Sequence, residues 1–140
     1  MDLGDVTYDV ADESFTLKDW MLGVAGGGEL GGCCISATLR DYARLGVFAL
    51  NEGQLPDGTR VLPENWMRES TAPSEGYGYL WWLFEPGYSA LGIFGQRIRV
   101  FPDDGILIAV QSNATAAVDT PYHAHQHFVV NAIRDHLAVD

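Results

Sequence analysis

The chain has 140 residues, of which 47% are hydrophobic and 19% are charged, and its formal net charge is −11. This composition is typical of a folded globular protein, and the length predicts a single domain over residues 1–140. The acidic balance argues against nucleic-acid and membrane partners. We see neither an apolar run of roughly 20 residues nor a signal peptide, so the default location of the chain as given is the cytoplasm, and the location is unknown if the chain is a piece of a longer protein.

The first part of the chain is rich in glycine. Residues 26–28 and 31–32 are all glycine, which indicates a backbone that bends or approaches another segment closely. Neither of the common phosphate-binding glycine motifs is present, so we interpret these glycines as structural. The adjacent Cys33 and Cys34 are too close for an unstrained disulfide and too few for a metal site, so two free thiols are expected.

A helix is predicted from Ser36 or Thr38 to about Leu50. Thr38 and Asp41 have the spacing of a capping box, and apolar residues then recur at intervals of three and four. Gly53 is suited to end the helix in the left-handed conformation.

The middle of the chain predicts a second helix and a hairpin. A short helix is expected from Pro63 to about Ser70, because proline is favoured at the first helical position. Residues 77–84 are aromatic and strand-like, and residues 85–87 would close a hairpin with residues 88–94. We assign these aromatic side chains to the core in preference to a substrate groove.

The clearest strand pattern covers residues 96–101, where polar and apolar residues alternate. Ile98 and Val100 should lie on one face of this strand, and Arg97 and Arg99 on the other.

A turn and another strand should follow. The sequence Pro-Asp-Asp-Gly over residues 102–105 combines the residues that tight turns favour. The continuous apolar run over residues 106–110 is typical of a strand buried on both faces.

The last predicted element is a helix over residues 122–137. Asp119 or Thr120 would cap it, and Pro121 would lie in its first turn. Its predicted apolar face contains Phe128, Val129, Ala132, Ile133 and Leu137.

Two histidines of this helix have a spacing that can bind zinc. His123 and His127 lie one turn apart, but no cysteine or acid of the helix stands at ligand spacing beside them. We therefore predict no metal and no other cofactor, and keep a metal-dependent or histidine-based activity at this helix as an alternative function.

Three segments, in this order, carry a family resemblance. They are residues 31–46, residues 62–66 with the aromatic run at 77–82, and residues 88–113, which contain Gly-Gln, a strand, a Pro-Asp turn and an apolar strand ending in Ser-Asn. Together they resemble the C-terminal part of the serine β-lactamase and penicillin-binding-protein-like hydrolases, in the branch of class C-like esterases and nylon-oligomer hydrolases. The resemblance covers nearly the whole chain. It implies an α+β fold in which an antiparallel sheet of three or four strands is flanked by helices.

Catalysis in that family uses Ser-x-x-Lys, a Tyr-x-Asn or Ser-Asp-Asn element and a Lys-Thr-Gly strand. None of these occurs here: Lys18 is the only lysine, and the position of Lys-Thr-Gly reads Ala90, Leu91, Gly92. The resemblance thus implies the last part of a larger hydrolase domain that acts on esters or amides. Without the nucleophile, this chain should be catalytically incompetent alone.

The resemblance also assigns a site. The backbone N–H of Ile93, just after the glycine, would be one of two oxyanion donors, which stabilise the charge that develops on a carbonyl oxygen. The accompanying pocket candidates are Tyr88, Ala90, Gly92, Phe94 and Gln96. The serine and lysine would come from another polypeptide segment.

The missing part has a physical consequence. A sheet without its neighbouring strands exposes an edge or an apolar face, and such surfaces associate. We therefore expect a homo-oligomer or pairing with a missing N-terminal segment of the same fold. A stand-alone, non-enzymatic binding module that uses the same scaffold is the remaining alternative.

Overall fold

The computed structural model describes residues 7–10, 13–16, 37–72 and 76–138. The chain divides into two compact units, Met1–Ser36 and Ala37–Asp140, and each is described by itself. In the first unit, β1 (Thr7–Val10) pairs antiparallel with β2 (Glu13–Thr16). The predicted glycine-rich segment and the two cysteines lie outside the described residues.

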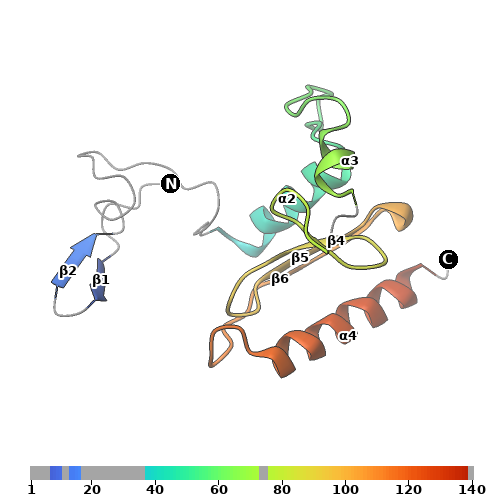
Figure 1. The fold of residues 1–140 in the computed structure, drawn as a ribbon. Helices are drawn as coiled ribbons and strands as arrows, with labels where there is room; N and C mark the ends of the chain where they lie inside the picture. Colours follow the sequence, from blue (N-terminus) through green and yellow to red (C-terminus); the bar gives the residue numbers. More distant parts are fainter. Residues whose placement is uncertain (1–6, 11–12, 17–36, 73–75, 139–140) are drawn as a thin grey trace. The chain divides into compact units, whose positions relative to one another are not determined.

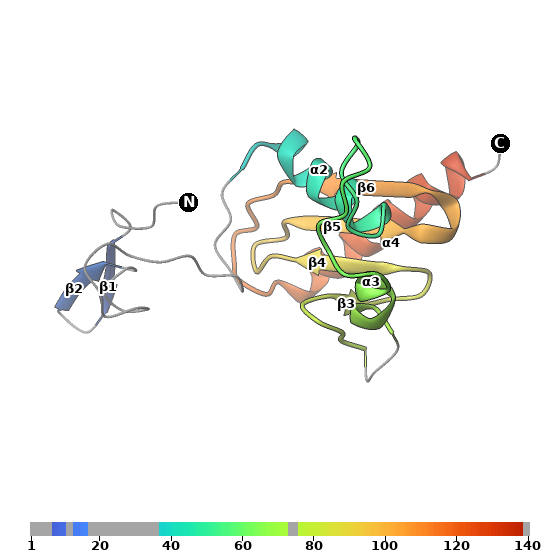
Figure 2. The same cartoon turned by 90° about the horizontal axis from the view of Figure 1, so that it is seen from above.

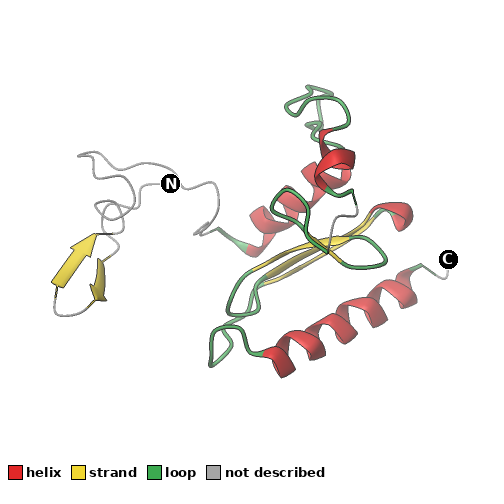
Figure 3. Cartoon of the chain, viewed as in Figure 1, coloured by secondary structure: helices red, strands yellow, loops and turns green. Residues whose placement is uncertain are grey.

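The second unit is a sheet between two helices (Figures 1 and 2). Its antiparallel strands lie in the order β3 (Trp82–Leu83), β4 (Tyr88–Leu91), β5 (Arg97–Phe101) and β6 (Ile106–Val110). Two long helices, α2 (Leu39–Leu50) and α4 (Thr120–Leu137), cover opposite faces, and the short α3 (Trp66–Ser70) precedes β3 (Figure 3). This arrangement confirms the predicted α+β class and the antiparallel sheet. Within the described parts of the chain, none of the helices has the length and hydropathy needed to span a bilayer.

Helix α2 begins and ends as its sequence predicts. The Thr38 hydroxyl accepts a hydrogen bond from the Asp41 N–H (3.3 Å) and donates one to the Asp41 carboxylate (2.7 Å). Gly53 follows the helix with φ +77°. Gly46 lets the helix approach the sheet closely, because a Cβ there would lie 2.9 Å from Cγ2 of Ile98. The core on this side consists of Ala49, Met67, Tyr88, Ile98 and Val100.

Strand β5 alternates as predicted, and both of its faces are buried. Ile98 and Val100 pack with α2, while Arg97 (4% exposed) and Arg99 (0%) lie on the opposite face, near His123 and His127 of α4. Two charged side chains of this strand, Arg97 and Arg99, are therefore buried inside the second unit.

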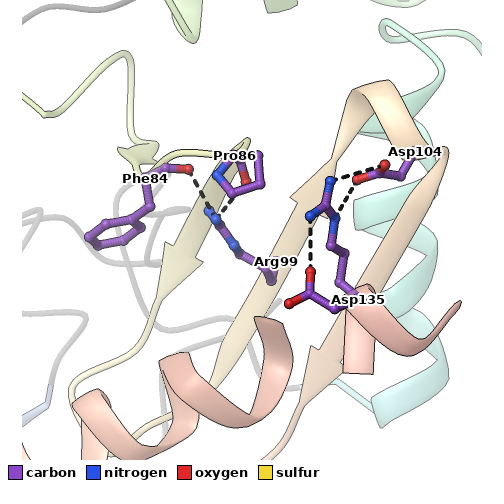
Figure 4. A network of polar contacts seen from close by, with 6 residues as sticks. Phe84, Pro86, Arg99, Asp104 and Asp135 are labelled. Carbon is purple, nitrogen blue, oxygen red and sulfur yellow. Dashed lines mark hydrogen bonds and ion pairs between the residues drawn. The ribbon is translucent and has the colours of Figure 1, made fainter. Parts of the chain in front are cut away.

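Both buried guanidinium groups donate hydrogen bonds to backbone carbonyls, and Figure 4 shows those of Arg99. Arg99 Nη2 donates to the carbonyls of Phe84 (3.0 Å) and Pro86 (2.6 Å), and its Cζ lies 4.6 Å from the centre of the Phe101 ring. Arg97 Nη2 donates to the carbonyl of His123 (3.3 Å). No described carboxylate forms an ion pair with Arg97 or Arg99, and Nε and Nη1 of both have no hydrogen-bond partner.

Burial without a counter-charge changes the pKa values of both groups. It lowers the pKa of Arg97. Burial, with the positive charges of Arg97 and Arg134, lowers the pKa of Arg99 to about 10, while Glu85 acts in the opposite direction. Arg134, by contrast, has its charge balanced by Asp104, whose carboxylate accepts from Nε and Nη2 (2.7 and 3.1 Å; Figure 4).

Three predicted elements are clearly shorter in the structure. The strand predicted over residues 88–94 ends at Leu91, because the residues after it form a turn. The second helix begins at Trp66 instead of Pro63, because Asn65 adopts φ 66° and interrupts the turn that precedes it. The aromatic strand is reduced to β3, because Leu80 has φ 65° and Gly78 N–H bonds to the Trp81 carbonyl (2.8 Å), which closes a turn.

The predicted apolar face of the last helix is wrong. Asp119 caps α4 by accepting from the Tyr122 N–H (3.1 Å), but Gln126 and Val130 are the buried residues, whereas Phe128 is 71% exposed. The sheet surface under α4 carries arginines, so the more polar side of the helix packs on it. Strand β6 also differs from its prediction, because it ends the sheet and its residues are half-buried.

Candidate functional site

The candidate site is the tight turn formed by residues 92–96, between β4 and β5. The N–H of Gly92 donates to the Gln96 carbonyl (2.7 Å), and the N–H of Gly95 donates to the Gly92 carbonyl (3.1 Å). The Gln96 side chain folds back, and its Oε1 accepts from the Phe94 N–H (3.2 Å). A side chain at position 92 would collide with this amide, because a Cβ there would lie 2.3 Å from Oε1.

A second segment holds the turn from outside. After β6, the N–H of Ala114 donates to the Phe94 carbonyl (3.0 Å), and the N–H of Val118 donates to the Ile93 carbonyl (2.7 Å). The Ser112 hydroxyl also donates to the Phe94 carbonyl (2.9 Å). The backbone of the turn is therefore fixed at two successive carbonyls.

The first turn of α4 completes this support. The Tyr122 hydroxyl lies 2.7 Å from Ser112 Oγ and accepts from Gln126 Nε2 (3.3 Å). Gly95 has φ +86°, and a Cβ on it would lie 2.5 Å from Cε1 of Tyr122. Only a glycine meets both conditions, so the turn, β6 and α4 are packed together at this point.

The N–H of Ile93 is one of two donors of the turn, with that of Gln96, for which the described residues supply no acceptor. The Ile93 carbonyl, by contrast, is bonded to the N–H of Val118. The Ile93 side chain is 57% exposed and that of Phe94 is 37% exposed. A backbone donor in a fixed turn can bind an oxyanion without reorganising, and this is the property that acyl-transfer sites require.

The structure brings together four of the predicted site residues, Gly92, Ile93, Phe94 and Gln96. Ala90 lies within β4, half-buried and packed against the core on the α2 side. Tyr88 lies at the far end of β4, 5% exposed, with its ring 4.9 Å from that of Trp81. Burial, aided by the charge of Glu52, raises the pKa of Tyr88 to about 12, so its phenol stays protonated in the core.

The two histidines lie elsewhere, on the side of α4 that faces the buried arginines. The ring of His127 packs against that of Phe84, with 5.5 Å between the ring centres. Its Nε2 lies 3.0 Å from Nδ2 of Asn131. Burial, followed by the charges of Arg99 and Arg97, lowers the pKa of His127. No group of three or more metal-ligating side chains occurs among the described residues, and the neighbouring guanidinium groups would repel a cation.

Sequence reasoning missed two parts of this region. Ser112 and Tyr122 were not recognised as supports of the turn, and the burial of Arg97 and Arg99 was not foreseen. The only local signal was the Ser-Asn that ends the β6 segment. The contacts themselves join segments ten or more residues apart and require the fold.

One comparison with known proteins bears on this site. The family model described as Beta-lactamase matches residues 5–132, which include the whole sheet and the turn at 92–96. The match supports the serine β-lactamase and penicillin-binding-protein-like superfamily, whose members share the serine-hydrolase scaffold predicted above. The chain belongs to the beta-lactamase family.

Proposed function

We propose that this chain supplies the oxyanion strand of a β-lactamase-like serine hydrolase. Strand β4 and the turn that follows it would bind the carbonyl oxygen of an ester or amide. The nucleophilic serine and its lysine would come from a Ser-x-x-Lys segment outside these 140 residues, because the sequence contains no such motif. In this proposal the chain alone does not catalyse hydrolysis.

The N–H of Ile93, which has no acceptor among the residues that the structure describes, is the observation that supports the proposal most directly. It follows Gly92 in a turn that is bonded through Gln96 on one side and through Val118 on the other. A single preorganised backbone donor is typically worth about 100- to 1,000-fold in the rate of acyl transfer. This donor survives the loss of the family lysine, because it depends on the backbone alone.

The side chain at position 90 favours the esterase and nylon-oligomer hydrolase branch over β-lactam substrates. In the resembling family a lysine starts this strand, whereas here Ala90 is half-buried and contributes no charge. A substrate carboxylate would lose its cationic partner at that position. We therefore propose an uncharged ester or amide substrate.

The proposal can be tested on the native protein. Lysate from the source organism would be labelled with a fluorophosphonate-biotin probe, which modifies activated serines, and this chain would then be captured with a specific antibody. We expect the captured material to contain a labelled serine, and tryptic mapping to place it in Ser-x-x-Lys. Captured chain without any labelled serine would contradict the proposal.

The role of the turn in catalysis can be tested with two matched variants of the hydrolase that contains this chain. Ile93→Pro removes the donor, whereas Ile93→Ala keeps the N–H and removes only the exposed side chain. We expect the proline variant to lose about 100-fold or more in kcat, and the alanine variant to keep most of it. Equal losses in both would assign the effect to the side chain and reject the oxyanion role.

A further inference from the structure

Three side chains behind the turn at residues 92–96 form a series of hydrogen bonds that runs in one direction. The Ser112 hydroxyl has a single hydrogen, which it donates to the Phe94 carbonyl (2.9 Å). The Tyr122 hydroxyl, 2.7 Å from Ser112 Oγ, must therefore be the donor to Ser112. Gln126 Nε2 in turn donates to the Tyr122 hydroxyl (3.3 Å). We call these three side chains, Gln126, Tyr122 and Ser112, the donor series.

The donor series continues through two peptide groups of the turn. The Phe94 carbonyl and the Gly95 N–H belong to one peptide group, and this N–H donates to the Gly92 carbonyl (3.1 Å). The Gly92 carbonyl shares a peptide group with the Ile93 N–H. Hydrogen bonds in series polarise one another, so an amide whose carbonyl accepts a hydrogen bond is a stronger donor at its N–H. Each bond of the series therefore makes the Ile93 N–H a stronger donor.

The series ends at only one of the two N–H groups of the turn that have no acceptor among the described residues. The other, that of Gln96, shares its peptide group with the Gly95 carbonyl, and no described group donates to that carbonyl. The polarisation therefore reaches the Ile93 N–H and bypasses that of Gln96. The N–H to which the family resemblance assigns the oxyanion role is thus also the one that the hydrogen bonds strengthen.

Burial protects the series from competing water. Gln126 is 8% exposed, Tyr122 and Ser112 are half-buried, and Gly95 is buried. Hydrogen bonds in such surroundings are stronger than in water. Gly95 keeps the series compact, because a Cβ at this position would lie 2.5 Å from Tyr122 Cε1 and 2.8 Å from Ser112 Oγ.

We propose that Tyr122, Ser112 and Gln126 are positioning residues that strengthen the Ile93 N–H as an oxyanion donor. The proposal rests on the oxyanion role proposed above for Ile93. The three side chains act through the backbone of the turn, and their effect is largest when the carbonyl oxygen becomes negative. It should therefore appear in kcat and leave KM nearly unchanged. A donor worth about 100- to 1,000-fold that is weakened by about 10–30% loses about two- to eightfold in rate.

The kinetic test uses the hydrolase that contains this chain. Tyr122→Phe removes the hydroxyl but keeps the ring beside Gly95, so kcat should fall about two- to eightfold while KM stays within about twofold. Ser112→Ala should lower kcat similarly, and adding Tyr122→Phe to it should cost nothing more, because Tyr122 acts through Ser112. Tyr79→Phe is the matched control and should leave kcat unchanged. The Tyr79 side chain is 59% exposed, and its hydroxyl has no hydrogen bond among the described residues.

A second measurement, on the purified chain, tests the series without reference to catalysis. The NMR resonance of the Gly95 amide proton reports its bond to the Gly92 carbonyl, and it moves upfield when that bond weakens. We expect an upfield shift in Tyr122→Phe and in Ser112→Ala, and no shift in Tyr79→Phe. An unmoved Gly95 resonance in both variants of the series would overturn the inference.

The kinetic outcomes distinguish this inference from the proposed function. If Ile93→Pro loses activity but Tyr122→Phe keeps its kcat, the inference is overturned and the oxyanion role of Ile93 stands. If Ile93→Pro keeps full activity, the oxyanion role fails, and the inference fails with it. Additive losses in the double variant, or a raised KM with unchanged kcat, would also overturn the inference, because they indicate general structural support or substrate binding.

Discussion

Replacing Arg97 by methionine should stabilise the protein. Arg97 is 4% exposed, forms no ion pair among the described residues, and makes one hydrogen bond, to the His123 carbonyl (3.3 Å). Its Nε and Nη1 are buried without partners. Most of the free energy lost by removing this charge from water is therefore not regained through contacts in the folded state.

The size of this stabilisation follows from two opposing terms, the cost of burying the charge and the gain from its hydrogen bond. An incompletely compensated buried ion costs several kcal/mol, and the single hydrogen bond to a carbonyl returns about 1.5–3 kcal/mol. Methionine has a similar length and fills irregular space, so it should leave little cavity. We expect Arg97→Met to raise the free energy of unfolding by about 1–3 kcal/mol, within the range seen when buried ions are replaced by apolar residues.

Urea unfolding followed by circular dichroism would measure this change. Arg44→Met is the matched control, because the Arg44 side chain is 70% exposed and its pair with Asp41 lies on the surface of α2. The control should change stability by less than about 0.5 kcal/mol. If Arg97→Met instead destabilised the protein by more than about 1 kcal/mol, the guanidinium would have a compensating partner. Our conclusion that Arg97 is buried between the sheet and α4 without a counter-charge would then be wrong.

Three further substitutions test other parts of the structure. Gly46→Ala would place a Cβ 2.9 Å from Ile98, so thermal or chemical unfolding should show a loss of about 1–3 kcal/mol. Thr38→Ala removes the cap of α2 and should cost about 1 kcal/mol, whereas Thr38→Ser should restore most of it. The pKa of His127 is lowered in the fold, so its contribution to stability is complete above about pH 6.5 and is lost as the pH falls below that value. His127→Gln should therefore flatten the stability profile between about pH 7 and pH 5, and an unchanged slope would contradict the shift.

Local signals predicted much of the fold. The cap at Thr38, the glycine after α2, the turn at residues 102–105 and the alternation in β5 each depend on neighbouring residues, and the structure contains all of them. The antiparallel order of β4, β5 and β6 followed because short turns join them. The interest in the Ile93 N–H came from the family resemblance, and no local sequence pattern singled it out.

What the sequence could not predict depends on packing between distant segments. Periodicity assigned Phe128 and its neighbours to the core, but a helix buries whichever face matches the surface below it. That surface carries Arg97 and Arg99, and nothing in the α4 sequence indicates this. The support of the turn by Ser112 and Tyr122 likewise joins the end of β6 to the start of α4. In the same way, the burial of Tyr88 depends on the position of Trp81.

The most direct test of the central claim is the intact mass of the purified chain after incubation with a fluorophosphonate. Among the described serines whose side chains can be placed, Ser70 and Ser89 are fully buried, and the Ser112 hydroxyl is bonded to the Phe94 carbonyl and paired with Tyr122. None of these lies beside a histidine or lysine base in the hydrogen bonds of the structure. The account predicts an unmodified mass, because the nucleophile belongs to another segment. A single stoichiometric adduct would contradict it, and the labelled peptide would identify a serine that is activated within this chain.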